Sequence, residues 1–179
     1  MAFNPQEDKR RIIKIRKEGI FKDIDTLTYK YAEASSVPSP QQRDVMSSDS
    51  TERPDGHLLA RNVEFREAEV RRILRRFIEP EELTIIADDE LQQNPYIEYH
   101  LIVSIKLKDE LLKSVATYIH RYLVYGALYD WYAAGMGSNQ SAVYAAELKQ
   151  LEAQIGNILN CETIIIPPLN PWGRPRNPL

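Results

Sequence analysis

The sequence predicts a mainly α-helical fold: a helical bundle with a long central helix, a short extended or β segment, and extended arms at both ends. Residues 109–135 carry apolar side chains at helical spacing, and the second half of this stretch is apolar on nearly every side. Residues 23–35, 58–78 and 142–159 show the narrower three- and four-residue periodicity of amphipathic helices. β-branched and aromatic residues concentrate within residues 83–107, which accounts for the extended segment.

The composition restricts the class of protein. The chain has 179 residues, 43% of them hydrophobic, which is enough for one domain with a core but not comfortably for two. The 23 basic and 26 acidic side chains give a net charge of -3, so we expect no global attraction to nucleic acid or anionic lipid. Cys161 is the only cysteine, which excludes an internal disulfide and points to a reducing compartment. We expect neither a secretory signal nor a membrane span.

The first 19 residues form a basic N-terminal arm, in which six lysines and arginines are interleaved with isoleucines. The alternation of Ile13 and Ile15 with basic neighbours fits either a short strand or a poorly ordered arm, and the local pattern leaves both open. We expect Gly19 to end this arm. Asp23 then stands where an N-cap is expected, which predicts a helix over residues 23–35.

A polar segment and a basic helix follow. Residues 35–57 are rich in serine and proline and hold few apolar side chains, so we expect a long mobile loop. Helical periodicity returns over residues 58–78, and Pro80 ends that helix. Its arginines recur at helical spacing and predict one basic ridge, made of Arg71, Arg72, Arg75 and Arg76. This ridge is either a solvated face balanced by glutamates, or a surface that contacts an acidic neighbour or DNA phosphate.

Two segments of β character lie before the central helix, at residues 83–87 and 96–107. In the second, the even-numbered side chains are more polar than the odd-numbered ones, which fits a half-buried strand or an extended chain over the helices. The connector contains Asp88, Asp89 and Glu90, which suggest a divalent cation. A solvated turn fits better, because the glycine-containing pattern of oxygen-ligand loops is missing.

The central helix needs cover on all sides, from this chain or from copies of it. Gly126 costs about 1 kcal/mol relative to alanine in a helix, so we expect another backbone or a large side chain to approach it closely. Asp130 has no histidine, lysine or second acid one turn away, so we expect it to bond to a facing Arg or Tyr. The residues expected to pack between subunits are Tyr122, Gly126, Tyr129, Asp130 and Trp131.

A tight turn follows the central helix. Within it, Ser138 or Asn139 is placed to cap the next helix, residues 142–159. The short connection makes these two helices antiparallel. Residues 161–179, the C-terminal arm, contain five prolines, which fix φ and remove donors. We expect this arm to be extended and, because it also carries apolar residues, to lie on another surface.

No pattern in the sequence predicts catalysis. His57, His100 and His120 are too scattered to suggest a metal centre, and motifs for phosphate loops, nucleophile elbows and zinc proteases are missing. A small hydrolase built on Asp130 and His120 would join residues about 15 Å apart along one helix. We therefore expect a helical scaffold without a catalytic, metal or cofactor site, and not an enzyme.

Two strings in the second half of the chain carry a resemblance. HRYLVYGALYDWY, residues 120–132, and YAAELKQLEAQI, residues 144–155, resemble the head-to-tail adaptor or connector proteins of tailed bacteriophages, in particular the neck ring proteins of crAss-like phages. The resemblance covers residues 96–159, and the DIDTLTYK helix more loosely. It implies an adaptor domain over residues 20–160 between the two arms, assembled as a homo-oligomeric ring that is expected to be a dodecamer.

The resemblance also implies a place in the virion neck, between the capsid portal and the tail, for a protein made in the host cytoplasm. Expected partners are other copies, the portal protein, further neck or tail proteins and, transiently, non-specific DNA in the channel, with no membrane. Portal contact is expected from the C-terminal arm, through Ile164, Ile166, Leu169, Trp172, Arg174 and Arg176. The basic ridge would then face the lumen or an interface. Alternatives are a phage DNA-binding or packaging-associated protein that uses its arginine ridge, or a host interaction module.

Overall fold

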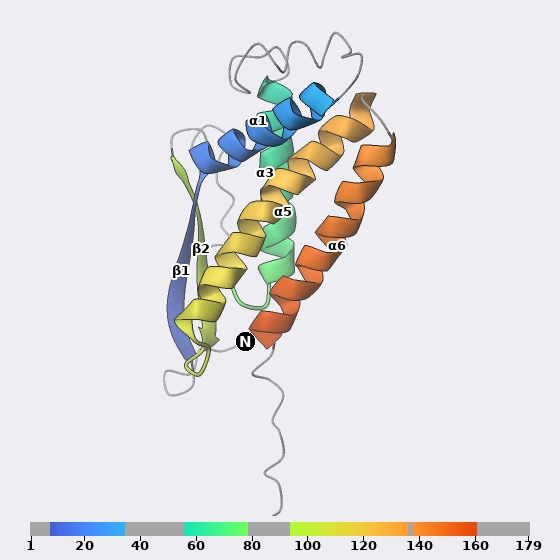
Figure 1. Ribbon diagram of the computed structural model, residues 1–179. Coiled ribbons are helices and arrows are strands. Elements are labelled where there is room, and N and C mark those ends of the chain that lie inside the picture. Colours follow the sequence, from blue (N-terminus) through green and yellow to red (C-terminus); the bar gives the residue numbers. More distant parts are fainter. Residues whose placement is uncertain (1–7, 35–55, 79–93, 136–137, 161–179) are drawn as a thin grey trace, which may run out of the picture.

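The computed structural model describes residues 8–34, 56–78, 94–135 and 138–160. Within them the chain forms four helices and one two-stranded antiparallel sheet (Figure 1), which confirms the predicted mainly α class. The elements in order are β1 (Asp8–Arg16), α1 (Lys17–Ala34), α3 (Gly56–Leu74), β2 (Tyr96–Ser104), α5 (Asp109–Gly135) and α6 (Ser138–Asn160). Most of the predicted loop, the predicted strand at 83–87 and the C-terminal arm lie outside the described residues.

Helix α5 is the centre of the fold, and it has the bounds that its apolar pattern predicts. Figure 1 shows α6 antiparallel beside it, α3 behind it, α1 across its upper half and the sheet along its lower half. Several of its side chains are completely buried: Val115, Ile119, Leu123, Ala127 and Leu128. The rest of the chain therefore covers this helix, and its apolar width no longer argues for copies of the chain as cover.

The basic N-terminal arm contains a strand, which decides between the two predicted alternatives. Ile13 and Ile15 are buried, whereas the preceding Ile12 is 54% exposed. In the antiparallel register, Ile13 lies opposite Tyr99 and Ile15 opposite Ile97. The odd-numbered residues of β2 are buried and its even-numbered residues are not, as the sequence predicts. The inner face of the sheet thus closes the core beside α5.

Helix α1 begins at Lys17, six residues before the predicted N-cap, so Gly19 and Asp23 lie inside the helix. The reason is a long-range contact. The Lys17 N–H, which has no partner within the helix, donates to the carbonyl oxygen of Pro95 at 3.0 Å. Ile20 in the first turn is completely buried. Packing against β2 and the core therefore starts the helix directly at the end of β1.

Helix α3 ends at Leu74, four residues before the predicted end. Residues 75–78 form a tighter turn, in which the Phe77 N–H donates to the Leu74 carbonyl at 2.7 Å. The Phe77 carbonyl in turn accepts the Ile102 N–H at 2.6 Å, and Ile78 forms a β-bridge with Leu101. This pairing with β2 draws the backbone out of the helix before Pro80 is reached.

Two further bounds differ from the prediction by three residues or more. Strand β2 ends at Ser104 rather than at residue 107, because the Leu107 N–H donates to the Ser104 carbonyl at 3.0 Å and forms the turn into α5. Helix α6 begins at Ser138 rather than at residue 142, so Asn139 is also helical instead of capping. Residues 138–141 contain neither glycine nor proline, and the helix extends back through them.

Candidate functional site

A cluster of charged and aromatic side chains joins α3 to α5. The Arg66 guanidinium donates two hydrogen bonds to the Asp130 carboxylate, from Nε at 2.9 Å and from Nη2 at 2.5 Å. Its Nη1 donates to Glu69 Oε2 at 2.5 Å. Arg66 is only 7% exposed, so this two-pronged pairing satisfies a buried charge. We call the group the Arg66 cluster: Arg66, Glu69, Tyr122, Gly126, Tyr129 and Asp130.

Gly126 provides the space through which the arginine reaches its partner. A Cβ atom at this position would lie 2.6 Å from both Cγ and Cδ of Arg66. Any larger residue would force the arginine stem aside, away from Asp130 one turn further along α5. This confirms two predictions from the sequence: that a large side chain approaches Gly126, and that Asp130 bonds to a facing arginine.

The electrostatics of the Arg66 cluster favour the charged arginine. Burial alone lowers the pKa of Arg66, but its hydrogen bonds to Asp130 and Glu69 outweigh burial and raise this pKa above the ordinary value. Glu69 also accepts the Tyr122 hydroxyl at 3.2 Å. Burial, followed by the negative charge of Glu69, raises the pKa of Tyr122 to about 12. The guanidinium carbon lies 5.3 Å from the Tyr129 ring centroid, in a cation–π contact.

The residues predicted to pack between subunits are engaged within this chain. Four of the five belong to the Arg66 cluster, between α3 and α5. The fifth, Trp131, is buried elsewhere on α5, with its ring 4.9 Å from that of Tyr132. The Arg66 cluster is a clamp between two helices, and its donors and acceptors bind one another rather than converging on an empty space.

The four predicted ridge arginines do not share one environment. Arg71 is half-buried, donates to Glu67 at 2.9 Å and lies over the Tyr99 ring on the β2 side of α3. Arg72 is exposed and approaches Glu152 of α6 at 3.9 Å. The remaining two, Arg75 and Arg76, are exposed in the turn after α3. The first arginine thus contributes to the fold, and the other three present charge at the surface.

His120 and Asp130 take different partners and do not converge. His120 Nε2 lies 2.9 Å from Asp23 Oδ2 on α1, whereas Asp130 binds Arg66 on α3. Among the described residues, no group of three or more His, Cys, Asp or Glu side chains could hold a metal ion. The acidic connector at residues 88–90 and the His57 side chain lie outside this description, and His100 approaches Glu98 at 3.6 Å.

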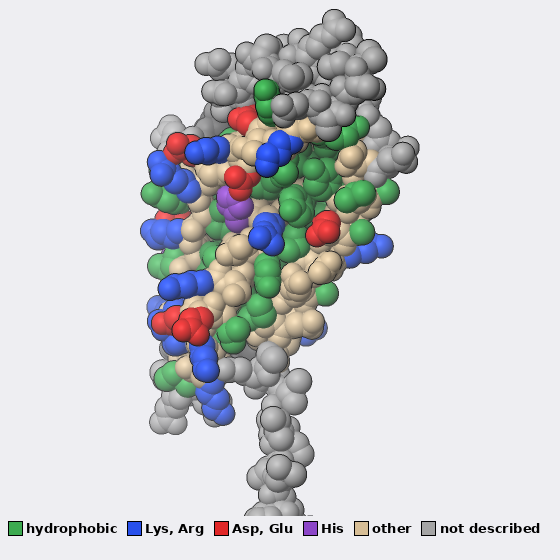
Figure 2. Space-filling model, in the orientation of Figure 1, with side chains coloured by type: hydrophobic (Ala, Val, Ile, Leu, Met, Phe, Trp, Pro, Cys, Tyr) green, Lys and Arg blue, Asp and Glu red, His purple; other side chains and the backbone are tan. Residues whose placement is uncertain are grey.

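An aromatic row crosses three helices. Its members are Tyr31 of α1, Tyr125, Trp131 and Tyr132 of α5, and Tyr144 of α6. The Tyr132 and Tyr144 rings are stacked, with centroids 5.8 Å apart, and Tyr125 lies 5.4 Å from Tyr144. Burial, with a contribution from Tyr125, raises the pKa of Tyr144. Figure 2 shows hydrophobic side chains gathered on this face, over α5 between α1 and α6.

A groove continues the aromatic row between α1 and α5. It measures about 210 Å³ and is lined by Asp23, Thr26, Leu27, His120, Arg121, Val124 and Tyr125. Because Tyr125 belongs to both features, we call the groove and the half-buried rings of Tyr125 and Tyr144 together the tyrosine groove. The ten tyrosines of the sequence indicate a chain rich in contacts. No local sequence pattern, however, shows which tyrosine rings from the three helices come together.

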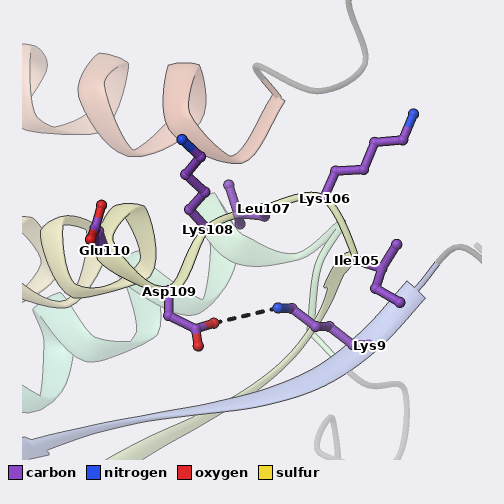
Figure 3. Close-up of a pocket in the computed structure, with 7 residues that line it drawn as sticks. All are labelled: Lys9, Ile105, Lys106, Leu107, Lys108, Asp109 and Glu110. Carbon is purple, nitrogen blue, oxygen red and sulfur yellow. Dashed lines mark hydrogen bonds and ion pairs between the residues drawn. The ribbon is translucent and has the colours of Figure 1, made fainter.

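A second hollow lies at the turn between β2 and α5 (Figure 3) and measures about 460 Å³. Asp109 at the start of α5 faces Lys9 across it at 3.4 Å and pairs with Arg11 at 3.0 Å. These cations, Arg11 first, lower the pKa of Asp109. The Lys106 and Lys108 side chains point away from this carboxylate in Figure 3. The hollow is therefore an ion-paired corner that joins β1 to α5.

The chain matches no family model, and comparison with curated proteins and with solved structures gives no match either. Among the described helices, none is both long and apolar enough to span a membrane. The described part of the chain thus has two distinctive features: the Arg66 cluster, whose polar groups bind one another, and the tyrosine groove on the surface. The first stabilises the fold, and the second is suited to contact with another chain.

Proposed function

We propose that this chain is a head–tail connector of a tailed bacteriophage: a virion protein whose copies form a neck ring, dock on the portal, extend the DNA channel and attach tail components. The observation that carries the proposal is the resemblance of residues 120–132 and 144–155 to such adaptors. In the fold these two strings face each other on α5 and α6, where Tyr125 and Tyr132 contact Tyr144. The similar strings thus make one structural unit, a helical hairpin with an aromatic seam.

The surface of the described domain also supports the proposal. Large apolar side chains are more than half exposed on separate elements: Ile12 of β1, Phe65 of α3, Ile105 after β2 and Val143 of α6. A subunit of a closed ring needs two different surfaces, one for each neighbour, and further surfaces for the rings above and below. Exposed apolar groups on several sides suit such a subunit better than a protein with a single ligand.

The low net charge fits a channel wall. A protein that neutralises many DNA phosphates binds duplex tightly, which would slow the passage of DNA. With a net charge of -3 and several basic residues of β1 paired with carboxylates, the chain is suited to brief, non-specific contact.

Mass measurements test the proposal. We expect the purified chain to be a monomer or small oligomer alone and to form a ring, with the mass of about twelve copies, when mixed with the portal of the same phage. Native mass spectrometry gives both masses. Failure to associate with that portal, at concentrations where the chain stays folded, would refute the connector function.

The alternative, a DNA-binding or packaging-associated protein, has one specific observation in its favour. Five of the nine residues of β1 are lysine or arginine, and Figure 2 shows basic side chains along this edge of the molecule. However, Lys9 and Arg11 pair with Asp109, and Lys14 pairs with Glu98 at 2.8 Å. Tight duplex binding that weakens steeply with salt would favour this alternative, and weak binding at moderate salt favours the connector.

A further inference from the structure

The tyrosine groove has the chemistry that binds proline-rich chains. Extended polyproline segments dock on grooves lined by aromatic side chains, because the rings pack against prolines and little conformational entropy is lost. Tyr125 and Tyr144 are half-buried, so each ring is held by its neighbours and still has surface to offer. Leu27 adds an aliphatic wall. A groove of about 210 Å³ is small for a drug-sized ligand, but a narrow extended chain needs no deep cavity.

The rim of the groove adds an acidic group. The Asp23 side chain is 57% exposed, and its Oδ2 lies 2.9 Å from His120 Nε2. A carboxylate offers about four acceptor positions on its two oxygens, so Asp23 can accept an arginine from another chain while it stays paired with His120. The groove thus combines apolar side chains with polar and charged ones, Arg121 among them, and its one carboxylate, Asp23, is the group that would pair with an arginine of a proline-rich ligand.

The chain itself contains such a ligand. The C-terminal arm repeats Pro-x-x-Pro twice, at residues 168–171 and 175–178. Three residues make one turn of a polyproline helix, so in that conformation both prolines of each repeat would lie on one edge. Arg174 and Arg176 flank Pro175 in the second repeat, and Trp172 precedes it. Proline spacing, an aromatic residue and positive charge therefore occur together in one segment that complements the groove.

The geometry favours a neighbouring copy as the donor of the arm. Helix α6 carries Tyr144 near its start and ends at Asn160, about 24 Å further along the helix axis. Figure 1 shows the end of α6 at the opposite end of the molecule from α1. A segment that begins where α6 ends would have to run back along this helix to reach the groove of its own subunit. A segment of 19 residues spans about 60 Å when extended, so its length allows contact with another copy of the chain.

We propose that the tyrosine groove of one subunit binds the proline-rich C-terminal arm, residues 164–179, of a neighbouring copy, with Asp23 pairing to Arg174 or Arg176. This inference rests on the proposed ring, since each arm that docks on the next groove adds one subunit in a head-to-tail order. In this proposal the arm binds another copy of the chain, whereas the resemblance implies that these residues contact the portal.

Crosslinking between isotopically distinct full-length chains tests the proposal. One preparation carries a photoreactive phenylalanine analogue in place of Trp172, and the second is unmodified and labelled with ¹⁵N. We expect irradiation of the mixture to join the unlabelled arm to labelled peptides from α1, α5 or α6 that contain Leu27, Tyr125 or Tyr144. Crosslinks confined to one copy, or to peptides away from the groove, would overturn the proposal.

A charge swap sharpens the test. Asp23→Lys in the ¹⁵N chain should reduce the crosslink yield about tenfold, the effect of one lost charge-assisted hydrogen bond. Arg174→Glu with Arg176→Glu in the other chain should restore much of it. Glu18→Lys is the matched control, because Glu18 is another exposed acid of α1, 72% exposed, outside the groove. An equal loss from both lysine variants would contradict the pairing.

The same sample with portal added separates the two proposals. A ring on the portal whose arms crosslink only to portal peptides would leave the connector function standing and refute the groove as the binding site. Crosslinks between copies without any portal association would support the groove and refute the connector function.

Discussion

At the scale of single residues, the described structure depends on Gly126 as much as on the charges of the Arg66 cluster. The buried guanidinium reaches Asp130 only because the position one turn earlier has no side chain. A buried arginine that loses its carboxylate leaves a charge without compensation, which costs about 3 to 5 kcal/mol when the pair is fully buried. Asp130 is 26% exposed and Glu69 also binds Arg66, so the cost here lies below that range.

Gly126→Ala should therefore lower the free energy of unfolding by about 1 to 3 kcal/mol, although alanine is the better helix former. Gly19→Ala is the matched control. Its added Cβ would lie 3.5 Å from His120 Cε1, an ordinary contact, so this variant should be neutral or more stable by up to about 1 kcal/mol. Urea unfolding of both variants gives the comparison, and wild-type stability of Gly126→Ala would contradict close packing there. Gly126→Leu should be more harmful, to stability or to ring formation.

The raised pKa of Tyr122 predicts that the folded chain loses stability in alkaline solution. Its pKa is raised to about 12 in the folded chain, above the ordinary value of 10.0. The folded state therefore keeps a proton that the unfolded state releases, and stability falls as pH rises from about 10 to 12. One proton corresponds to a slope of at most about 1.4 kcal/mol per pH unit. Tyr122→Phe should remove this part of the slope. If wild type and variant lose stability in parallel above pH 10, Tyr122 does not titrate as described.

At the scale of elements, the sequence predicts the ends of a helix well where its periodicity is strong. Apolar side chains recur at helical spacing throughout α5, and its observed ends agree with the prediction. The start of α1 and the end of α3 differ because backbone bonds between distant residues set them, Lys17 to Pro95 and Ile102 to Phe77. No local window of sequence contains both partners of such a bond.

The candidate site could likewise be predicted from the sequence only in part. Gly126 and Asp130 stand out within one helix, which is why a facing arginine can be predicted. Arg66 itself lies 64 residues away from Asp130, and nothing in its own surroundings distinguishes it from the other arginines of α3. The tyrosine groove combines side chains from three helices, and its existence depends on how these helices pack.

Strand β1 provides a test at the element scale. Ile13 faces the core and is 5% exposed, whereas the adjacent Ile12 faces outward. Ile13→Ala should lower the free energy of unfolding by about 2 to 4 kcal/mol, since it leaves a cavity under the sheet. Ile12→Ala should change it by about 0.5 kcal/mol or less. Equal effects in thermal unfolding would mean that the arm does not pair with β2 in the observed register.

At the scale of the whole molecule, the described elements share one hydrophobic core. The core runs from β1 and β2 through α5 to α6, and the described helices all contribute completely buried residues: Ile20 of α1, Val70 of α3, Leu123 of α5 and Ile155 of α6. Helix α6 ends with a hydrogen bond from Asn160 Nδ2 to the Gly156 carbonyl at 2.7 Å. Such a side chain satisfies one of the last carbonyls of the helix, which have no partner within it.

Deleting residues 161–179 should therefore separate folding from assembly. We expect the shortened chain to keep its helical circular dichroism and to melt within about 2 to 4 °C of the full chain, the shift that corresponds to a change of about 1 kcal/mol. Its copies should no longer crosslink through the tyrosine groove, and its ring on the portal should be weakened. If the shortened chain instead unfolds, the proline-rich arm belongs to the core of its own subunit, because only a segment that buries apolar surface there could stabilise the fold that strongly.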